Sequence, residues 1–94
     1  MYVRVVRFTD VTADRVEGLL ARIEEEGPPP GVPIKGLQML FDADQETAVV
    51  LQLFDGAEEM RAGAEAFAAM DPGETPGTRV SVDMCELKLE LDVP

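Results

Sequence analysis

The side chains that most often carry out chemistry are scarce in this sequence. Its 94 residues include no histidine and no tryptophan, and no asparagine either. Histidine is the commonest general base and metal ligand near neutral pH. Its absence excludes Ser-His-Asp triads, histidine-based zinc sites and haem held by a proximal histidine. We therefore expect no metal site.

Two further candidates for chemistry are weak. Cys85 is the only cysteine, so no intramolecular disulfide can form, which suits a reducing cytoplasm. We expect it to be buried in mid-strand, and no histidine is present to activate it as a nucleophile. Asp42, Asp44 and Glu46 are spaced like the opening of a calcium loop. Because glycine is missing from the sixth position and glutamate from the twelfth, a solvated hairpin is the better interpretation.

Charge and length set the broad class. The formal charge is −11, with 19 acidic residues against 8 basic ones, so the surface repels phosphate backbones and anionic lipids. We expect neither nucleic acid nor membrane partners. The N-terminus does not read as a signal peptide, and no apolar run approaches the roughly 18–20 residues that span a bilayer. The sequence predicts a cytoplasmic protein with a single domain over residues 1–94.

The elements that would position functional side chains follow the order βαββαβ. The first helix begins at Thr12 as N-cap and ends before Gly27, and Asp55 is the expected cap of the second helix, with Glu58 completing a capping box. A proline-rich connector in polyproline II conformation is expected over 27–33, and the second helix should end at 71–73. Alternation predicts strands over 2–9, 34–41, 47–54 and 79–91.

This order predicts an α+β fold of the ferredoxin-like type, a four-stranded antiparallel sheet with both helices on one face. The other face should be polar in a monomer. Strand 47–54 instead carries Val49, Leu51 and Leu53 on one face and Ala48, Val50 and Phe54 on the other. A sheet that is apolar on both faces needs cover on both, and a second copy of the chain is the simplest cover.

The last strand supports a homodimer. Val82 and Met84 share one parity, whereas Cys85, Leu87 and Leu89 share the other, so the apolar register changes between Met84 and Cys85. A bulge or a change of neighbours would explain the change. The second half of the strand is expected to reach the partner. A dimer of dimers also fits the sequence.

The pattern resembles the dimeric α+β barrel superfamily, in particular the antibiotic biosynthesis monooxygenase-like proteins. The resemblance rests on Leu40-Phe41-Asp42, on the run from Thr47 to Glu59, and on Cys85-Glu86-Leu87. It implies cofactor-free oxygenases that use asparagine and tryptophan, or haem degraders that add a histidine. Phe54 occupies the position where the tryptophan would be expected, and Val6 lies near the position of the expected asparagine. The resemblance therefore implies the fold more strongly than either activity, and we expect no cofactor.

The candidate binding residues follow from this resemblance and from strand alternation. If Phe54 faces a cavity on the helix-free side of the sheet, Gln52 lies beside it, and Gln38 and Arg4 share that side. They would line an apolar pocket with a few polar groups, which is typical of small-molecule sites. Their alternative role is to pack the dimer interface. The sequence thus predicts a homodimer that binds a small apolar ligand or acts as an interaction module. The alternative is a cofactor-free monooxygenase acting on an aromatic polyketide-like substrate, and whether the protein is an enzyme stays open.

The two early arginines should lie on opposite faces of the first strand. Arg4 and Arg7 are an odd number of residues apart, so they cannot form one anion clamp. Arg4 would either pair with an interior carboxylate such as Asp83 or bind an acidic ligand. A structural salt bridge is the expected role.

Overall fold

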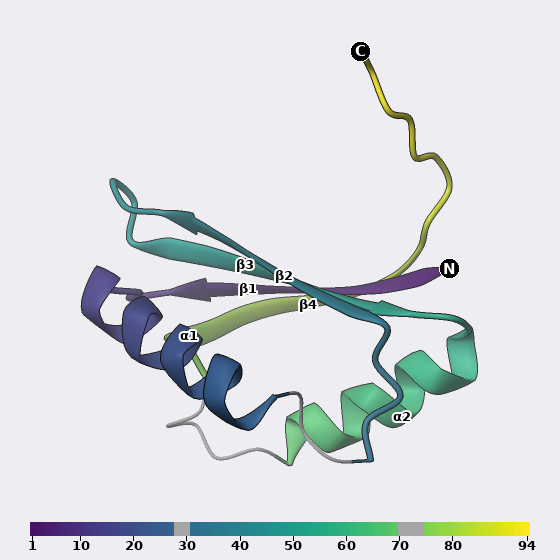
Figure 1. Ribbon diagram of the computed structural model, residues 1–94, viewed down its shortest axis with the longest axis horizontal. Coiled ribbons are helices and arrows are strands. Elements are labelled where there is room, and N and C mark those ends of the chain that lie inside the picture. Colours follow the sequence, from purple (N-terminus) through teal and green to yellow (C-terminus); the bar gives the residue numbers. More distant parts are fainter. Residues whose placement is uncertain (28–30, 70–74) are drawn as a thin grey trace.

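The predicted order of elements is confirmed in a computed structural model that describes residues 1–27, 31–69 and 75–94 (Figure 1). The middle of the proline-rich connector and the predicted end of the second helix lie outside the described residues. The elements are β1 (Tyr2–Thr9), α1 (Ala13–Glu26), β2 (Gly36–Asp42), β3 (Thr47–Phe54), α2 (Ala57–Ala68) and β4 (Thr78–Glu86).

The four strands form one antiparallel sheet in the order β2-β3-β1-β4. The central pair is β1 with β3, in which Arg4 stands opposite Gln52 and Val6 opposite Val50. Both helices lie on one side of the sheet, and the C-terminal segment rises on the other side (Figure 1). The architecture is therefore the ferredoxin-like arrangement that the sequence predicts.

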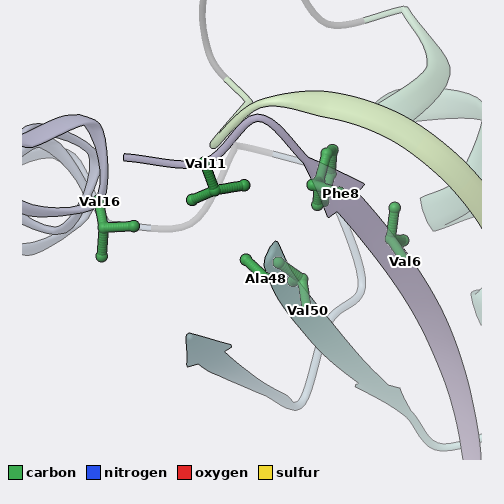
Figure 2. Packing of buried hydrophobic residues seen from close by; sticks show 6 residues of the cluster. All are labelled: Val6, Phe8, Val11, Val16, Ala48 and Val50. Atoms are coloured by element: carbon green, nitrogen blue, oxygen red, sulfur yellow. The ribbon is translucent and has the colours of Figure 1, made fainter. Parts of the chain in front are cut away.

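The core lies on the helix-covered face. Successive residues of a strand point to opposite sides, so the even-numbered residues of β1 and β3 share this face. Apart from Tyr2 they are buried, whereas the odd-numbered apolar residues are only partly buried. Figure 2 shows how the core cluster is completed from the β1–α1 connection and from α1; its members are Val6, Phe8, Val11, Val16, Ala48 and Val50.

The predicted N-cap of α1 is confirmed, whereas the predicted N-cap of α2 is not. The Thr12 hydroxyl accepts a hydrogen bond from the Arg15 N–H at 3.2 Å, and Gly27 ends α1 with a φ of 71°. The predicted cap at Asp55 is wrong, because Gly56 is the N-cap of α2 and makes no side-chain cap hydrogen bond. The Asp55 carboxylate instead pairs with the ammonium of Lys35 at 3.3 Å.

The last strand is shorter than predicted. It ends at Glu86 rather than Leu91, because β1 begins at Tyr2 and offers no further residues for pairing. The last link is the hydrogen bond from the Leu87 N–H to the Met1 carbonyl at 2.9 Å. The register irregularity of β4 also lies elsewhere than predicted, opposite Arg7 and Phe8. Val82 and Met84 therefore lie on the helix-covered face and Cys85 lies on the opposite face, and no bulge separates them.

The sheet face without helices, here named the open face, carries an apolar strip. Its members from the central strands are partly exposed: Val3, Val5, Val49, Leu51 and Leu53. On the edge strand β2, Leu40 is 55% exposed. Cys85 stands opposite Val3 on this face and is exposed, which corrects the prediction of a buried thiol. Both described helices lie on the other side of the sheet and so do not cover these side chains (Figure 1).

Two features of the described residues bear on the classes of function open to the protein. Among the helices of residues 1–27, 31–69 and 75–94, none is long and apolar enough to cross a membrane. The same part of the chain contains no group of three or more His, Cys, Asp or Glu side chains placed to hold a metal ion.

A glycine in α2 fixes how closely this helix approaches the sheet. A Cβ added at Gly63 would lie 2.5 Å from Cε1 and 2.6 Å from Cζ of the Phe54 ring, which is fully buried. We expect Gly63→Ala to lower the free energy of unfolding by about 1–3 kcal/mol, because overpacking outweighs the gain in helix propensity. Urea denaturation followed by circular dichroism measures the change.

Gly18 in α1 is the matched control. A Cβ added there meets nothing within 4 Å, and the position is exposed. Gly18→Ala should raise the free energy of unfolding by about 0.5–1 kcal/mol through helix propensity alone. Equal effects of the two substitutions would contradict the close contact between α2 and Phe54.

Candidate functional site

A pocket of about 550 Å³ lies on the helix-covered face, between the sheet and the two helices. Its apolar wall comes from the sheet, from α1 and from the end of α2, with Val6, Met39, Val50, Leu19, Ile23 and Phe67 among the lining residues. This volume lies within the range of small-molecule sites, roughly 300–1,000 Å³.

The pocket exists because α1 does not close on the sheet. Val16 is the only residue of this helix that is buried. Leu19 and Ile23, which lie one and two turns further along the same stripe, are only partly buried and line the pocket. The apolar stripe of α1 therefore begins in the core and continues along the pocket wall.

Arg4 lies at the base of this pocket on β1 and is only 4% exposed. Its Nη1 donates a hydrogen bond to Oε1 of Gln52 at 2.8 Å. Its guanidinium carbon lies 5.6 Å from the centre of the Phe67 ring, which is within the range of a cation–π contact. Its Nε is buried and has no hydrogen-bond partner in residues 1–27, 31–69 and 75–94. Arg4 and Gln52, the Arg4–Gln52 pair, are the two buried polar residues of the described part of the chain.

No carboxylate of the described residues compensates the charge of Arg4. Among the described residues, neither Arg4 nor Arg79 takes part in an ion pair. Burial lowers the pKa of the Arg4 guanidinium below its ordinary value, and the nearby positive charge of Arg79 lowers this pKa further. Arginine nevertheless keeps its proton in proteins, so a full positive charge stays at the base of the pocket.

The pocket collects positive charge in an acidic protein. Four of the chain's eight basic residues line it, namely Arg4, Arg22, Lys35 and Arg79. A single acidic residue, Glu26, lies among the described lining residues, although the chain has 19. Lys35 already pairs with Asp55. Arg4 and Arg79 take part in no ion pair among the described residues, and these two charges make the pocket suited to an anion.

The four residues proposed from the sequence do not share one site. Arg4 and Gln52 are adjacent on paired strands and both line the pocket. Phe54 lies on the same face but is fully buried, and it packs against α2 at Gly63 instead of lining the pocket. Gln38 stands opposite Leu51, which places it on the open face, where it is exposed.

Two predictions about this face need correction. The expected grouping on the helix-free side is wrong, since the even-numbered residues of β1 and β3 face the helices. The expected pairing of Arg4 with Asp83 is also wrong. Asp83 stands opposite Val5 and so points to the open face. The prediction that Arg4 and Arg7 point to opposite faces is confirmed, because Arg7 is exposed and Arg4 is buried.

Sequence reasoning did not identify the helical side of the pocket. Leu19 and Ile23 belong to an obvious apolar stripe, but a stripe does not reveal whether it closes on the core or lines a gap. Phe67 and Arg79 are far from Leu19 and Ile23 in the sequence, so no local pattern groups them with these residues. The one available signal for Arg4 is an arginine between valines at an even position of β1, in the same parity as the core residues Val6 and Phe8.

The unpaired charge has a measurable consequence for stability. We expect the double variant Arg4→Met, Gln52→Leu to raise the free energy of unfolding by about 1–3 kcal/mol, because apolar side chains replace a buried charge and its amide acceptor. Gln52→Leu alone should lower it by about 1–3 kcal/mol, because Arg4 then loses its hydrogen-bond acceptor. Urea denaturation of the three proteins measures both. A double variant less stable than the wild type would show that the Arg4–Gln52 pair stabilises the fold.

This chain resembles known proteins in its structure, whereas comparison of its sequence finds no match. No family model matches the sequence, and no curated protein matches it significantly. Among solved structures, a mutant of MhuD with two manganese protoporphyrin IX molecules bound per active site gives a TM-score of 0.59 at 21% identity, covering 100% of this chain and 99% of that one. The heme-degrader MhuD from Mycobacterium tuberculosis, with two hemes in its active site, gives 0.54 at 22% identity, with 100% of each chain covered.

A third structure is less similar. An uncharacterized NIPSNAP domain protein from Burkholderia xenovorans gives a TM-score of 0.46 at 20% identity and covers 100% of this chain and 99% of that one. At the identities of the two MhuD structures, structural likeness establishes the fold alone. That fold is the ferredoxin-like βαββαβ domain that the sequence predicts.

Proposed function

We propose that this protein binds a small, largely apolar molecule in the pocket between α1, α2 and the sheet, and does so as a homodimer. The observation that carries the first part is the open apolar stripe of α1, where Leu19 and Ile23 line a pocket of about 550 Å³. A ligand in the pocket would remove this apolar surface from water. Burial stabilises by roughly 25 cal/mol per Å², which is enough to favour a ligand of suitable shape.

Haem does not fit the lining of this pocket. The two MhuD structures hold protoporphyrin or heme, so the same ligand needs to be tested against these residues. Haem iron is usually held by histidine, cysteine or tyrosine, or by methionine together with histidine. The described lining includes Met39 but no Cys or Tyr, and the chain has no histidine. We therefore do not extend haem binding to this chain.

Binding is a better conclusion than oxygenase activity. The alternative of a cofactor-free monooxygenase rests on the family resemblance, and Val6 and Phe54 depart from the asparagine and tryptophan that the resemblance implies for it. Val6 lines the pocket as an apolar wall residue, and Phe54 is held in the core away from it. No feature of the described pocket favours oxygen chemistry over simple binding.

A neutral fluorescent probe tests the binding function. N-phenyl-1-naphthylamine has an apolar body and no charge, and we expect its emission to rise on addition of the protein. Leu19→Trp places a larger side chain in the pocket wall and should weaken binding roughly ten-fold or more, since about 1.4 kcal/mol of lost contact suffices.

Leu20→Trp is the matched control on the same helix. Leu20 is 43% exposed and is absent from the pocket lining, so the probe should bind this variant as it binds the wild type. An unchanged emission with the wild type, or equal binding by both variants, would contradict the proposed pocket function.

The open face supports the second part of the proposal. A partly exposed apolar strip along β1 and β3 is the kind of surface that a partner covers. The C-terminal segment 87–94 lies on the same side of the sheet (Figure 1), and its Leu89 and Leu91 are 73% and 72% exposed. A second copy related by a two-fold axis would cover the strip and give this segment a surface to pack on. A dimer of dimers is compatible with the same surface.

Oligomeric state is tested by light scattering and by a charge placed on the strip. The wild type should have about twice the monomer mass of 10.2 kDa. Leu51→Glu puts a carboxylate at the centre of the open face, where its desolvation opposes association, and should yield a monomer. Ala21→Glu adds the same charge to the exposed side of α1 and should leave the dimer intact. A monomeric wild type would instead support an interaction module that uses this face for a different partner.

A further inference from the structure

We propose that the ligand of this pocket is an apolar molecule that carries a carboxylate, and that Arg4 is the residue that receives this carboxylate. The inference rests on the proposed binding function and names its ligand class. Four observations carry it: the burial of Arg4, its unused hydrogen-bonding capacity, the absence of a described carboxylate partner, and the apolar wall around it.

The guanidinium of Arg4 has more hydrogen-bond donors than the described residues use. It carries five N–H donors in a fixed plane, and the one hydrogen bond given to a described residue is that from Nη1 to Gln52. Nε is buried and finds no partner in the part of the chain that the structure describes. Buried polar groups are normally satisfied, so an exception calls for an explanation such as an absent ligand. A carboxylate is the group whose two oxygens match the guanidinium plane.

The charge of Arg4 is also unbalanced. Lysine and arginine are almost never fully buried without a partner, because desolvating an unpaired charge costs several kcal/mol. The one carboxylate predicted as a partner, Asp83, points to the opposite face. The second cation on the lining, Arg79, repels Arg4 and adds to the demand for an anion. One carboxylate would neutralise one of these two charges and reduce the repulsion between them.

The surroundings of Arg4 select the rest of the ligand. Phe67 lies over the guanidinium, and Val6 and Val50 flank the Arg4–Gln52 pair on β1 and β3. A small hydrated anion would leave these side chains without contact. A ligand with an apolar body and one acidic end would fill the wall and reach the charge at the base. Gln52 holds the guanidinium in place and so fixes where the acidic end must lie.

The net charge of −11 does not oppose this assignment. Exposed carboxylates are screened over about 8 Å at physiological ionic strength, whereas a buried pair is screened much less. The attraction at the base of the pocket is therefore local. The acidic surface would slow the approach of an anion without deciding its affinity.

A matched pair of probes tests the assignment. 2-Naphthoate and 2-naphthamide have the same ring system and similar size, and only the former carries a charge. We expect isothermal titration calorimetry to show that wild-type protein binds the carboxylate roughly 10- to 100-fold more tightly than the amide. Acetate, which has the charge without the apolar body, should bind more weakly than 2-naphthoate.

Substitution of Arg4 should remove the preference for 2-naphthoate over 2-naphthamide. Arg4→Met is expected to bind both naphthalene probes equally, because the charged donor is lost while the apolar wall remains. Arg61→Met is the control, since it removes the same charge from an exposed position of α2 outside the pocket lining, and it should keep the full preference. The comparison of two ligands on each protein does not depend on equal stability of the variants.

The outcomes separate the two proposals. Tighter binding of 2-naphthoate that disappears in Arg4→Met supports the assignment. Equal binding of both probes by the wild type overturns the carboxylate ligand and leaves the apolar pocket function standing. A preference that survives in Arg4→Met also overturns it and transfers the role to another cation. Failure of both naphthalene probes and of N-phenyl-1-naphthylamine to bind overturns the pocket function and the assignment together.

Discussion

The register of β1 against β3 is the constraint on which the other features depend. Because Val6 stands opposite Val50 in the two central strands, their even-numbered side chains together form one surface and their odd-numbered side chains form the other. The first surface becomes the core and the pocket, and the second becomes the open face. A slip of β1 by one residue would place its odd-numbered side chains beside the even-numbered ones of β3, which would expose Val6 and bury Val5 against the helices.

This register also explains how far the sequence could predict the molecule. Alternation and capping signals were sufficient for the order of the elements, the Thr12 cap and the two apolar faces of β3. They could not decide which face the helices cover, because both faces of β3 have nearly the same composition. The candidate pocket was therefore assigned to the wrong side, and Gln38 was grouped with Gln52 although the pairing of β2 places it on the other face.

The extent of the elements depends on neighbours that a sequence does not reveal. The alternation of apolar residues continues to Leu91, yet β4 ends at Glu86 where β1 no longer provides hydrogen-bonding groups. Likewise, the stripe of α1 continues to Ile23, yet only Val16 is buried by the sheet. In both cases the apolar pattern extends beyond what one chain covers. A pattern of this kind is consistent with surfaces completed by a partner and by a ligand.

The placement of charge links stability to function in this small domain. Most carboxylates lie on the surface, where water solvates them at little cost, whereas Arg4 lies in the same row of β1 as the core residues Val6 and Phe8. A domain of this size has only a modest stability of several kcal/mol, so an unpaired charge in that row is a substantial burden. Sites shaped for a ligand are often unfavourable without it, and ligand binding then stabilises the fold by mass action. A carboxylate on Arg4 would convert the most unfavourable buried group of the described structure into a charge-assisted contact. The free protein should then gain more stability from its ligand than apolar contact alone provides.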